Sequence, residues 1–134
     1  MKQLYTLIES TTFLQFPELY KSLSIQETRF QAARQLNKAI AKTAPDIVLA
    51  EFFYGFGNNY AGINISNLDV SLHALQRHAP QAKIMVLVDK ADRPYVPKLE
   101  ALFKIDAILT LPVTASDIKT AINGLYKKSP GRGF

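Results

Sequence analysis

Three short apolar runs constrain the fold of this chain more than any other feature of its sequence. They span residues 46–50, 83–88 and 106–111. None of them alternates between apolar and polar residues, and each is short enough to be a strand, so each predicts a strand buried on both faces. A similar run covers 3–8, whereas residues 22–26 alternate as an edge strand would. The chain is therefore expected to build a parallel sheet.

Helical periodicity separates the predicted strands. Apolar residues recur at helical spacing within 30–40, 68–75 and 118–125, and shorter helices are expected at 13–20 and 97–104. Pro45 should close the first of these helices, and a Ser66–Asp69 pair should cap the start of the second. Thr114 or Ser116 should open the last helix. Strand and helix thus alternate five times, which predicts an α/β domain with helices on both faces of the sheet.

Length and composition exclude several classes of protein. The chain has 134 residues, 48% of them hydrophobic, which suits one domain with a true apolar core. It contains no cysteine, so disulfides, thiolate catalysis and cysteine metal sites are excluded. The N-terminal residues lack the apolar stretch of a signal peptide, and no apolar run is long enough to cross a membrane. We expect a cytoplasmic protein without a membrane segment.

Positive charge is concentrated at the end of the chain. The formal net charge is +5, and Lys127, Lys128 and Arg132 supply three of these charges, which leaves +2 for residues 1–126. A balanced body without a basic face is not typical of nucleic-acid binding, so no nucleic-acid partner is expected. Residues 1–126 are predicted to form the domain, and 127–134 a flexible basic tail.

Ligand sites of such sheets lie beyond the carboxyl ends of the strands. The residues expected at these ends are Glu9, Ser10, Glu51, Val88, Asp89, Leu111 and Pro112. Glu9, Glu51 and Asp89 are candidate oxygen ligands for Mg²⁺, although Lys90 could neutralise Asp89. No Ser/His/Asp arrangement or pair of carboxylates supports hydrolytic chemistry here, so we expect no enzymatic activity.

An aromatic, glycine-rich segment, FFYGFGNNYAGIN, follows Glu51 at 52–64. Phe52 and Phe53 are expected to point partly into the core, whereas Tyr54, Phe56 and Tyr60 should form an interaction loop, because amphipathic rings are frequent in interfaces. The segment lacks the lysine of a phosphate-binding loop, so a nucleotide is not favoured and no cofactor is expected.

The motifs PDIVLAE at 45–51, KIMVLV at 83–88 and IDAILTLP at 105–112, taken in this order, resemble the receiver domain of two-component response regulators. The resemblance covers 2–126 and implies a flavodoxin-like fold with strand order 2-1-3-4-5. It further implies a carboxylate pair for Mg²⁺, an aspartate phosphate acceptor, a Ser or Thr, and a Lys before a proline that follows a cis bond. These positions are occupied here by Glu9 and Ser10, Glu51, Val88, and Leu111 before Pro112. Relative to receivers, the interval from Glu51 to Val88 is several residues longer, and the excess falls within 52–64.

Most of the phosphorylation chemistry is missing from these positions. Val88 cannot donate a hydrogen bond to a phosphoryl oxygen, and Leu111 cannot neutralise one. Glu51 would carry its carboxylate one methylene further than an aspartate does. The resemblance therefore implies a degenerate, non-phosphorylatable pseudo-receiver that acts through protein–protein interaction. Two interpretations of Glu51 remain open: a solvated strand end, and a fixed charge that imitates the phosphorylated acceptor.

Receivers often associate through their fourth helix, fifth strand and fifth helix, and the resemblance implies a homodimer through this face. Its candidate residues, apart from those that the core requires, are Tyr95, Val96, Leu99, Phe103, Ile118, Ile122 and Tyr126. An alternative function is a small-ligand sensor that binds a metabolite or cofactor at the carboxyl ends of the strands, beneath residues 52–64. The sequence identifies no particular protein partner.

Overall fold

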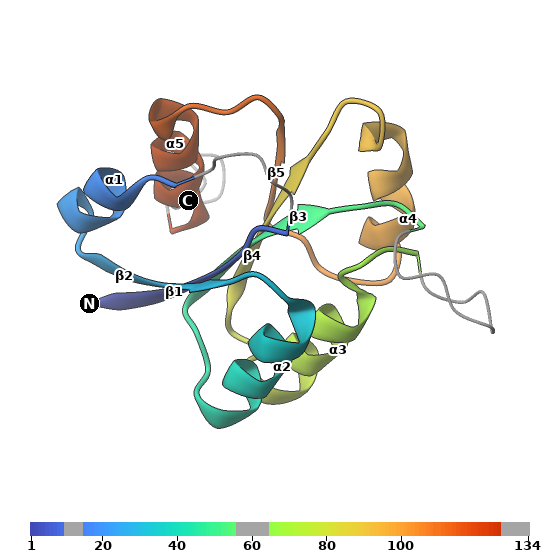
Figure 1. Ribbon diagram of the computed structural model, residues 1–134, viewed down its shortest axis with the longest axis horizontal. Coiled ribbons are helices and arrows are strands. Elements are labelled where there is room, and N and C mark those ends of the chain that lie inside the picture. Colours follow the sequence, from blue (N-terminus) through green and yellow to red (C-terminus); the bar gives the residue numbers. More distant parts are fainter. Residues whose placement is uncertain (10–14, 56–64, 127–134) are drawn as a thin grey trace, which may run out of the picture.

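A computed structural model describes residues 1–9, 15–55 and 65–126. Its centre is a five-stranded parallel sheet with strand order β2-β1-β3-β4-β5 (Figure 1). The strands are β1 (Lys2–Leu7), β2 (Ile25–Phe30), β3 (Ile47–Phe52), β4 (Lys83–Val88) and β5 (Ala107–Thr110). The helices are α1 (Pro17–Ser22), α2 (Ala33–Lys42), α3 (Asp69–His78), α4 (Val96–Glu100) and α5 (Ala115–Leu125), with a 3₁₀ turn, η1 (Arg93–Tyr95), before α4. The predicted fold class and strand order are both confirmed.

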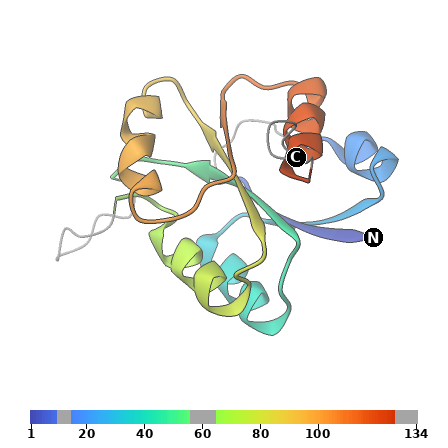
Figure 2. The ribbon, with the colours of Figure 1, turned by 180° about the vertical axis from the view of Figure 1, so that it is seen from behind.

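Helices cover both faces of the sheet, as Figures 1 and 2 show from opposite sides. α1 and α5 pack on one face around Leu49, Met85 and Ile118, whereas α2, α3 and α4 pack on the other around Val86 and Leu72. All six residues of β3 are buried, which explains why its sequence does not alternate. The two clusters form one core that is divided by the sheet.

The edge strand β2 begins later than its alternating pattern predicts. Leu23 and Ser24 form the turn that ends α1, and Ser24 has a left-handed φ of 57°. β2 then pairs with β1 in parallel from Lys2↔Ile25 to Leu7↔Phe30. The expectation of a strand at 22–26 is therefore wrong for its first half, because the local pattern does not distinguish a turn from a strand of similar polarity.

The predicted start of α5 is confirmed by its hydrogen bonds, whereas the predicted Ser66–Asp69 pair is bonded in the turn that leads into α3, whose N-cap position is Leu68. At α5, the Thr114 side chain accepts from the Asp117 backbone N–H, and the Asp117 carboxylate accepts from the Thr114 N–H. At α3, the Asp69 carboxylate accepts from the backbone N–H of Ser66 at 2.8 Å, and the Ser66 hydroxyl accepts from the N–H of Leu68 at 3.0 Å. At α5, side chains thus satisfy backbone donors that a helix start leaves without partners, and at α3 they order the turn before the helix.

The α1 side of the sheet buries polar groups beside its apolar core. Thr6 is 1% exposed and donates its hydroxyl hydrogen to Glu27 across the β1–β2 pair at 2.6 Å. Tyr20 lies on the buried side of α1. This burial raises the pKa of its phenol well above the usual range, and nearby Glu27 raises it further. Tyr20 is therefore held in its neutral form in this part of the core.

The core uses most of the face through which a homodimer was expected. Val96, Leu99, Phe103, Ile118 and Ile122 are each at most 5% exposed. Only the two tyrosines of the expected set remain at the surface. Tyr95 follows β4 at the carboxyl edge of the sheet, while the Tyr126 ring contacts Lys2 at the amino edge, so the two do not form one patch.

Among the described helices, none combines the length and hydropathy that crossing a membrane requires.

Candidate functional site

The parallel strands end side by side, which brings most of the predicted site residues to one edge of the sheet (Figure 1). Phe52 lies in register with Val88, and Val88 lies in register with Thr110. The N–H of Leu111 donates to the carbonyl oxygen of Val88 at 2.8 Å, which continues this alignment past the end of β5. The Leu111–Pro112 peptide bond is cis, as the resemblance implied.

Glu51 lies inside the protein. It is only 2% exposed, so the interpretation of this residue as a solvated strand end is wrong. Side chains alternate between the two faces along a strand. Leu49, two residues before Glu51, packs in the α1/α5 cluster, whereas the adjacent residues Ala50 and Phe52 pack in the opposite cluster. The Glu51 side chain is therefore directed to the α1/α5 face of the sheet.

The two apolar positions of the site lie on different faces. Leu111 packs against the α1/α5 cluster and so shares a face with Glu51, whereas Val88 belongs to the cluster on the opposite face. Val88 has no exposed surface and Leu111 is half-buried. Neither side chain can donate a hydrogen bond or carry a charge, so neither can stabilise a phosphoryl group near Glu51.

Asn67 ties the ends of β1 and β3 together. Its side-chain N–H₂ donates to the Glu9 carboxylate at 2.6 Å and to the carbonyl oxygen of Glu51 at 2.8 Å. Its side-chain oxygen accepts from the N–H of Phe53 at 2.7 Å. One amide therefore joins Glu9, two residues after β1, to the backbone on both sides of Phe52, at the edge of the sheet where the sequence placed candidate Mg²⁺ ligands.

Asn67 is itself held by the hydrogen bonds of the turn before α3. The neighbouring Ser66 donates both its backbone N–H and its hydroxyl to the Asp69 carboxylate, at 2.8 and 3.0 Å. Asp69 also accepts from the N–H of Ile65 at 2.8 Å and is 4% exposed. Because Asp69 fixes the two residues before Asn67, it fixes the position from which the amide reaches Glu9.

The segments on either side of residues 56–64 run antiparallel and form a neck, defined here as 53–55 with 65–67. The N–H of Gly55 donates to the carbonyl oxygen of Ile65 at 2.9 Å, and the N–H of Asn67 donates to the carbonyl oxygen of Phe53 at 3.3 Å. Gly55 has a φ of +68°, a conformation that favours glycine. The neck positions Asn67 opposite Phe53.

Tyr54 docks the neck onto the segment that follows β4. Its ring stacks on Tyr95 with 3.8 Å between ring centroids, and its N–H donates to the Asp92 carboxylate at 3.2 Å. The Lys98 ammonium lies 5.4 Å from the centroid of the Tyr54 ring and 5.8 Å from that of the Tyr95 ring. Tyr54 is 38% exposed, so part of the ring remains available to a partner, but its other face is already occupied by Tyr95.

The three candidate Mg²⁺ ligands have separate environments. Glu9 accepts from Asn67, Glu51 is buried, and Asp89 is an exposed residue whose carboxylate accepts from the N–H of Ala91 at 3.0 Å. Within residues 1–9, 15–55 and 65–126, no group of three or more acidic, histidine or cysteine residues is arranged to hold a metal ion. Ser10, Phe56 and Tyr60, which the sequence also singled out, lie outside the described residues.

Sequence reasoning missed Asn67, although one signal was available. Asn67 lies inside the predicted Ser66–Asp69 cap, at the start of a helix that follows a strand, so it had to lie near the carboxyl edge of the sheet. Its partners could not be read from the sequence, because Glu9 lies 58 residues and Glu51 lies 16 residues away along the chain.

Comparisons with known proteins show the fold. The sequence matches no protein-family model and no curated protein sequence. Among solved structures, a response regulator receiver domain protein from Clostridium thermocellum superposes with a TM-score of 0.70 at 16% identity, covering 93% of this chain and 94% of that one. A CheY-like receiver domain protein from Methanospirillum hungatei gives 0.69 at 15% identity and 92% of both chains. A structure named adenylate cyclase, from Rhodopirellula baltica, gives 0.69 at 16% identity, covering 92% of this chain and 86% of that one. The chain therefore has the fold of response regulator receiver domains.

Proposed function

We propose that this chain is a regulatory domain that takes no phosphoryl group, catalyses no reaction and acts through contacts with other proteins. The observation that carries the proposal is the environment of Glu51, which is 2% exposed at the position where receivers hold their acceptor. The site offers Val88 and Leu111 in place of the hydroxyl and ammonium groups that a transferred phosphoryl group requires. Residues 1–126 as the domain and a cytoplasmic location belong to the same proposal, and the tail expected at 127–134 lies outside the described residues.

The hydrogen bonds of Asn67 support this proposal independently of the apolar substitutions. Glu9 occupies the position at which the resemblance expects a Mg²⁺ ligand. Its carboxylate accepts a hydrogen bond from the amide of Asn67 at 2.6 Å. The same amide holds the backbone on both sides of Phe52. A site closed in this way favours one fixed conformation over a switch between two. The alternative function places a ligand beneath residues 52–64, and of these residues 56–64 lie outside the described part of the chain.

Incubation with acetyl phosphate and Mg²⁺ should leave the protein's intact mass unchanged. The reason is that charge developing on a transferred phosphoryl group would meet no donor from Val88 or Leu111. Mass spectrometry of the intact protein measures the outcome directly, with a Glu51→Gln variant treated in parallel. A gain of one phosphoryl group in the natural protein that the Glu51→Gln variant lacks would contradict the proposal.

The contacts with other proteins are proposed to include a homodimer through α4, β5 and α5. β5 is an edge strand that pairs only with β4 in the described sheet, so its outer backbone groups face away from the sheet. Beside it, Leu109, Val113 and Ala121 are partly buried and line a hollow of about 400 Å³ between β5 and α5. This hollow, and not the tyrosines at the two ends of the sheet, is the part of the face that we assign to the contact.

A Thr120→Arg variant should remain monomeric at concentrations where the natural protein forms dimers. Thr120 is exposed on α5 and lines the hollow, so an arginine there would place two charges against each other across a symmetric contact. Sedimentation velocity over a range of concentrations measures the effect, with Thr43→Arg, an exposed position after α2, as the matched control. A natural protein that stays monomeric throughout this range would refute the homodimer while leaving the phosphorylation test unaffected.

A further inference from the structure

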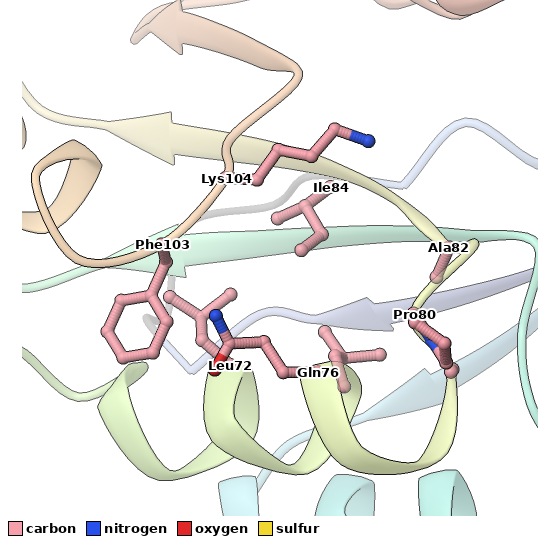
Figure 3. Close-up of a pocket in the computed structure, with 9 residues that line it drawn as sticks. Leu72, Gln76, Pro80, Ala82, Ile84, Phe103 and Lys104 are labelled. Carbon is pink, nitrogen blue, oxygen red and sulfur yellow. The ribbon is translucent and has the colours of Figure 1, made fainter.

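A cavity of about 230 Å³ opens between α3 and the segment that joins α4 to β5 (Figure 3). Leu72 and Leu75 from α3 form one wall, Phe103 forms another, and Ile84 of β4 lies between them. Ile84 is the second residue of β4 and is paired with Val48, near the start of β3. The cavity therefore lies toward the amino ends of the strands, away from Glu51 and Asn67.

On the side opposite α3, the cavity is bordered by turns that follow α4. α4 ends at Glu100, and the chain leaves it through turns in which the N–H groups of Leu102 and Phe103 both donate to the carbonyl oxygen of Leu99. Across the cavity, Ala79 and Ala82 flank the turn between α3 and β4, and neither carries a side chain large enough to fill the space. The sequence thus leaves a space that it could have closed with larger residues at these two positions.

The walls are already in place without a ligand. Leu72, Ala82 and Phe103 are each at most 4% exposed, so their positions are fixed by the core. The His73 ring packs edge-on against the Phe103 ring, with 4.8 Å between their centroids. Binding therefore needs little ordering of side chains, which favours affinity for a small molecule.

Two polar side chains, Gln76 and Lys104, line the otherwise apolar cavity, and Figure 3 shows them on opposite sides of it. The Lys104 ammonium lies 3.3 Å from one carboxylate oxygen of Asp106, and the other oxygen accepts from the Ile84 N–H at 2.8 Å. Asp106 thus orients the lysine but takes only one of its three N–H donors. The lysine side chain is 64% exposed, so its remaining donors can reach a bound anion.

We propose that this cavity binds a small molecule that consists of an aromatic ring and a short chain ending in a carboxylate. The ring lies between Leu72, Ile84 and Phe103, and the carboxylate meets Lys104. A dry apolar cavity of about 150 Å³ accepts benzene, so about 230 Å³ leaves room for a ring with a short chain. Arg77 in the last turn of α3 offsets the negative end of that helix dipole toward the anion. This site goes beyond the proposed regulatory function and does not depend on it.

Titration of ¹⁵N-labelled protein with 3-phenylpropionate tests the proposal. We expect saturable shifts of the amide signals of Ala79, Ala82, Ile84 and Lys104. The neutral analogue 3-phenylpropanamide should bind about two- to fivefold more weakly, because it cannot form the partly exposed ion pair with Lys104. Lys104→Gln should abolish this difference while retaining binding of both compounds. Shifts that do not saturate, or that concentrate at other residues, would overturn the site.

Filling the cavity provides a separate test. Ala82→Leu should reduce the affinity for 3-phenylpropionate at least tenfold, whereas Ala115→Leu, at an exposed position at the start of α5, should not change it. If Ala82→Leu fails to fold, Gln76→Trp covers the mouth from an exposed position and should cause a similar loss. Unchanged affinity in the folded filling variant would refute the proposal. Phosphoryl transfer is measured separately by mass, so the failure of one proposal is distinguishable from the failure of the other.

Discussion

Replacing Asp69 with alanine is expected to lower the free energy of unfolding by about 3 kcal/mol, because hydrogen bonds to a charged group contribute more than neutral ones. The carboxylate is 4% exposed and accepts from the N–H groups of Ile65 and Ser66 and from the Ser66 hydroxyl, all within 3.0 Å. In the variant these donors are left without their acceptor in a place that water reaches poorly. The α3 start also loses a negative charge that its dipole favours.

Thermal and urea unfolding followed by circular dichroism measure this loss, which corresponds to a fall in Tm of about 10 °C for a domain of this size. Glu100→Ala, which removes an exposed carboxylate from α4, is the matched control and should stay within about 0.5 kcal/mol of the natural protein. Asp69→Asn should fall between the two, because the amide keeps one acceptor oxygen and loses the charge. A loss below 1 kcal/mol in Asp69→Ala would mean that the Asp69 hydrogen bonds do not stabilise the turn before α3.

The central strands could be predicted because their burial leaves a direct trace in the sequence. β3 and β4 are covered on both faces, so nearly every residue in them is apolar and no polar alternation hides the pattern. β2 leaves a weaker trace. Its inward-facing positions include Glu27 and Arg29, which resemble surface residues, yet Glu27 accepts from the buried Thr6 hydroxyl. An edge strand whose polar residues are satisfied by a neighbouring strand cannot be located from periodicity alone.

The fourth helix was extended too far for a related reason. Val96, Leu99 and Phe103 are all buried at helical spacing, which predicts a helix through 104, but α4 ends at Glu100 and Phe103 reaches the core from a turn. Periodicity reports which residues are buried and not which backbone conformation buries them. The cavity beside Phe103 is bordered by the turns that follow this early end, so no local pattern could have predicted it.

The candidate site was predictable in position and not in its interactions. Parallel strands that alternate with helices bring their carboxyl ends to one edge, which is sufficient to gather Glu9, Glu51 and Leu111 there. Whether Glu51 is buried depends on what packs above it. The sequence of the strand end is the same whether this carboxylate is buried or exposed, so burial could not be predicted from it. The contact between Asn67 and Glu9 joins residues that are 58 positions apart, and this distance exceeds what any local motif encodes.

Replacing Asn67 with alanine is expected to cost about 2–3 kcal/mol of unfolding free energy, because three part-buried hydrogen bonds are lost together. Asn67→Asp should cost at least as much, although the side chain has the same size. Its carboxylate can still accept from the Phe53 N–H, but it places oxygen against the Glu9 carboxylate and the Glu51 carbonyl, where the amide had donated. Asn123→Ala, at an exposed position of α5, is the matched control and should change stability by less than about 0.5 kcal/mol.

The comparison of these variants tests whether the Asn67 amide occupies the place that the resemblance gives to Mg²⁺. By resemblance, Mg²⁺ would join the acid that follows β1 to the acceptor strand. Here the neutral N–H₂ group of Asn67 joins them through hydrogen bonds, at 2.6 Å from Glu9 and 2.8 Å from the Glu51 carbonyl, and leaves the Glu9 charge in place. If the amide acts as this donor, Glu9→Gln should weaken the destabilising effect of Asn67→Asp, because it removes one of the two facing charges. Urea unfolding of the two single variants and the double variant gives this coupling directly. Purely additive losses would show that Asn67 stabilises only the backbone near Phe53 and does not substitute for a cation at Glu9.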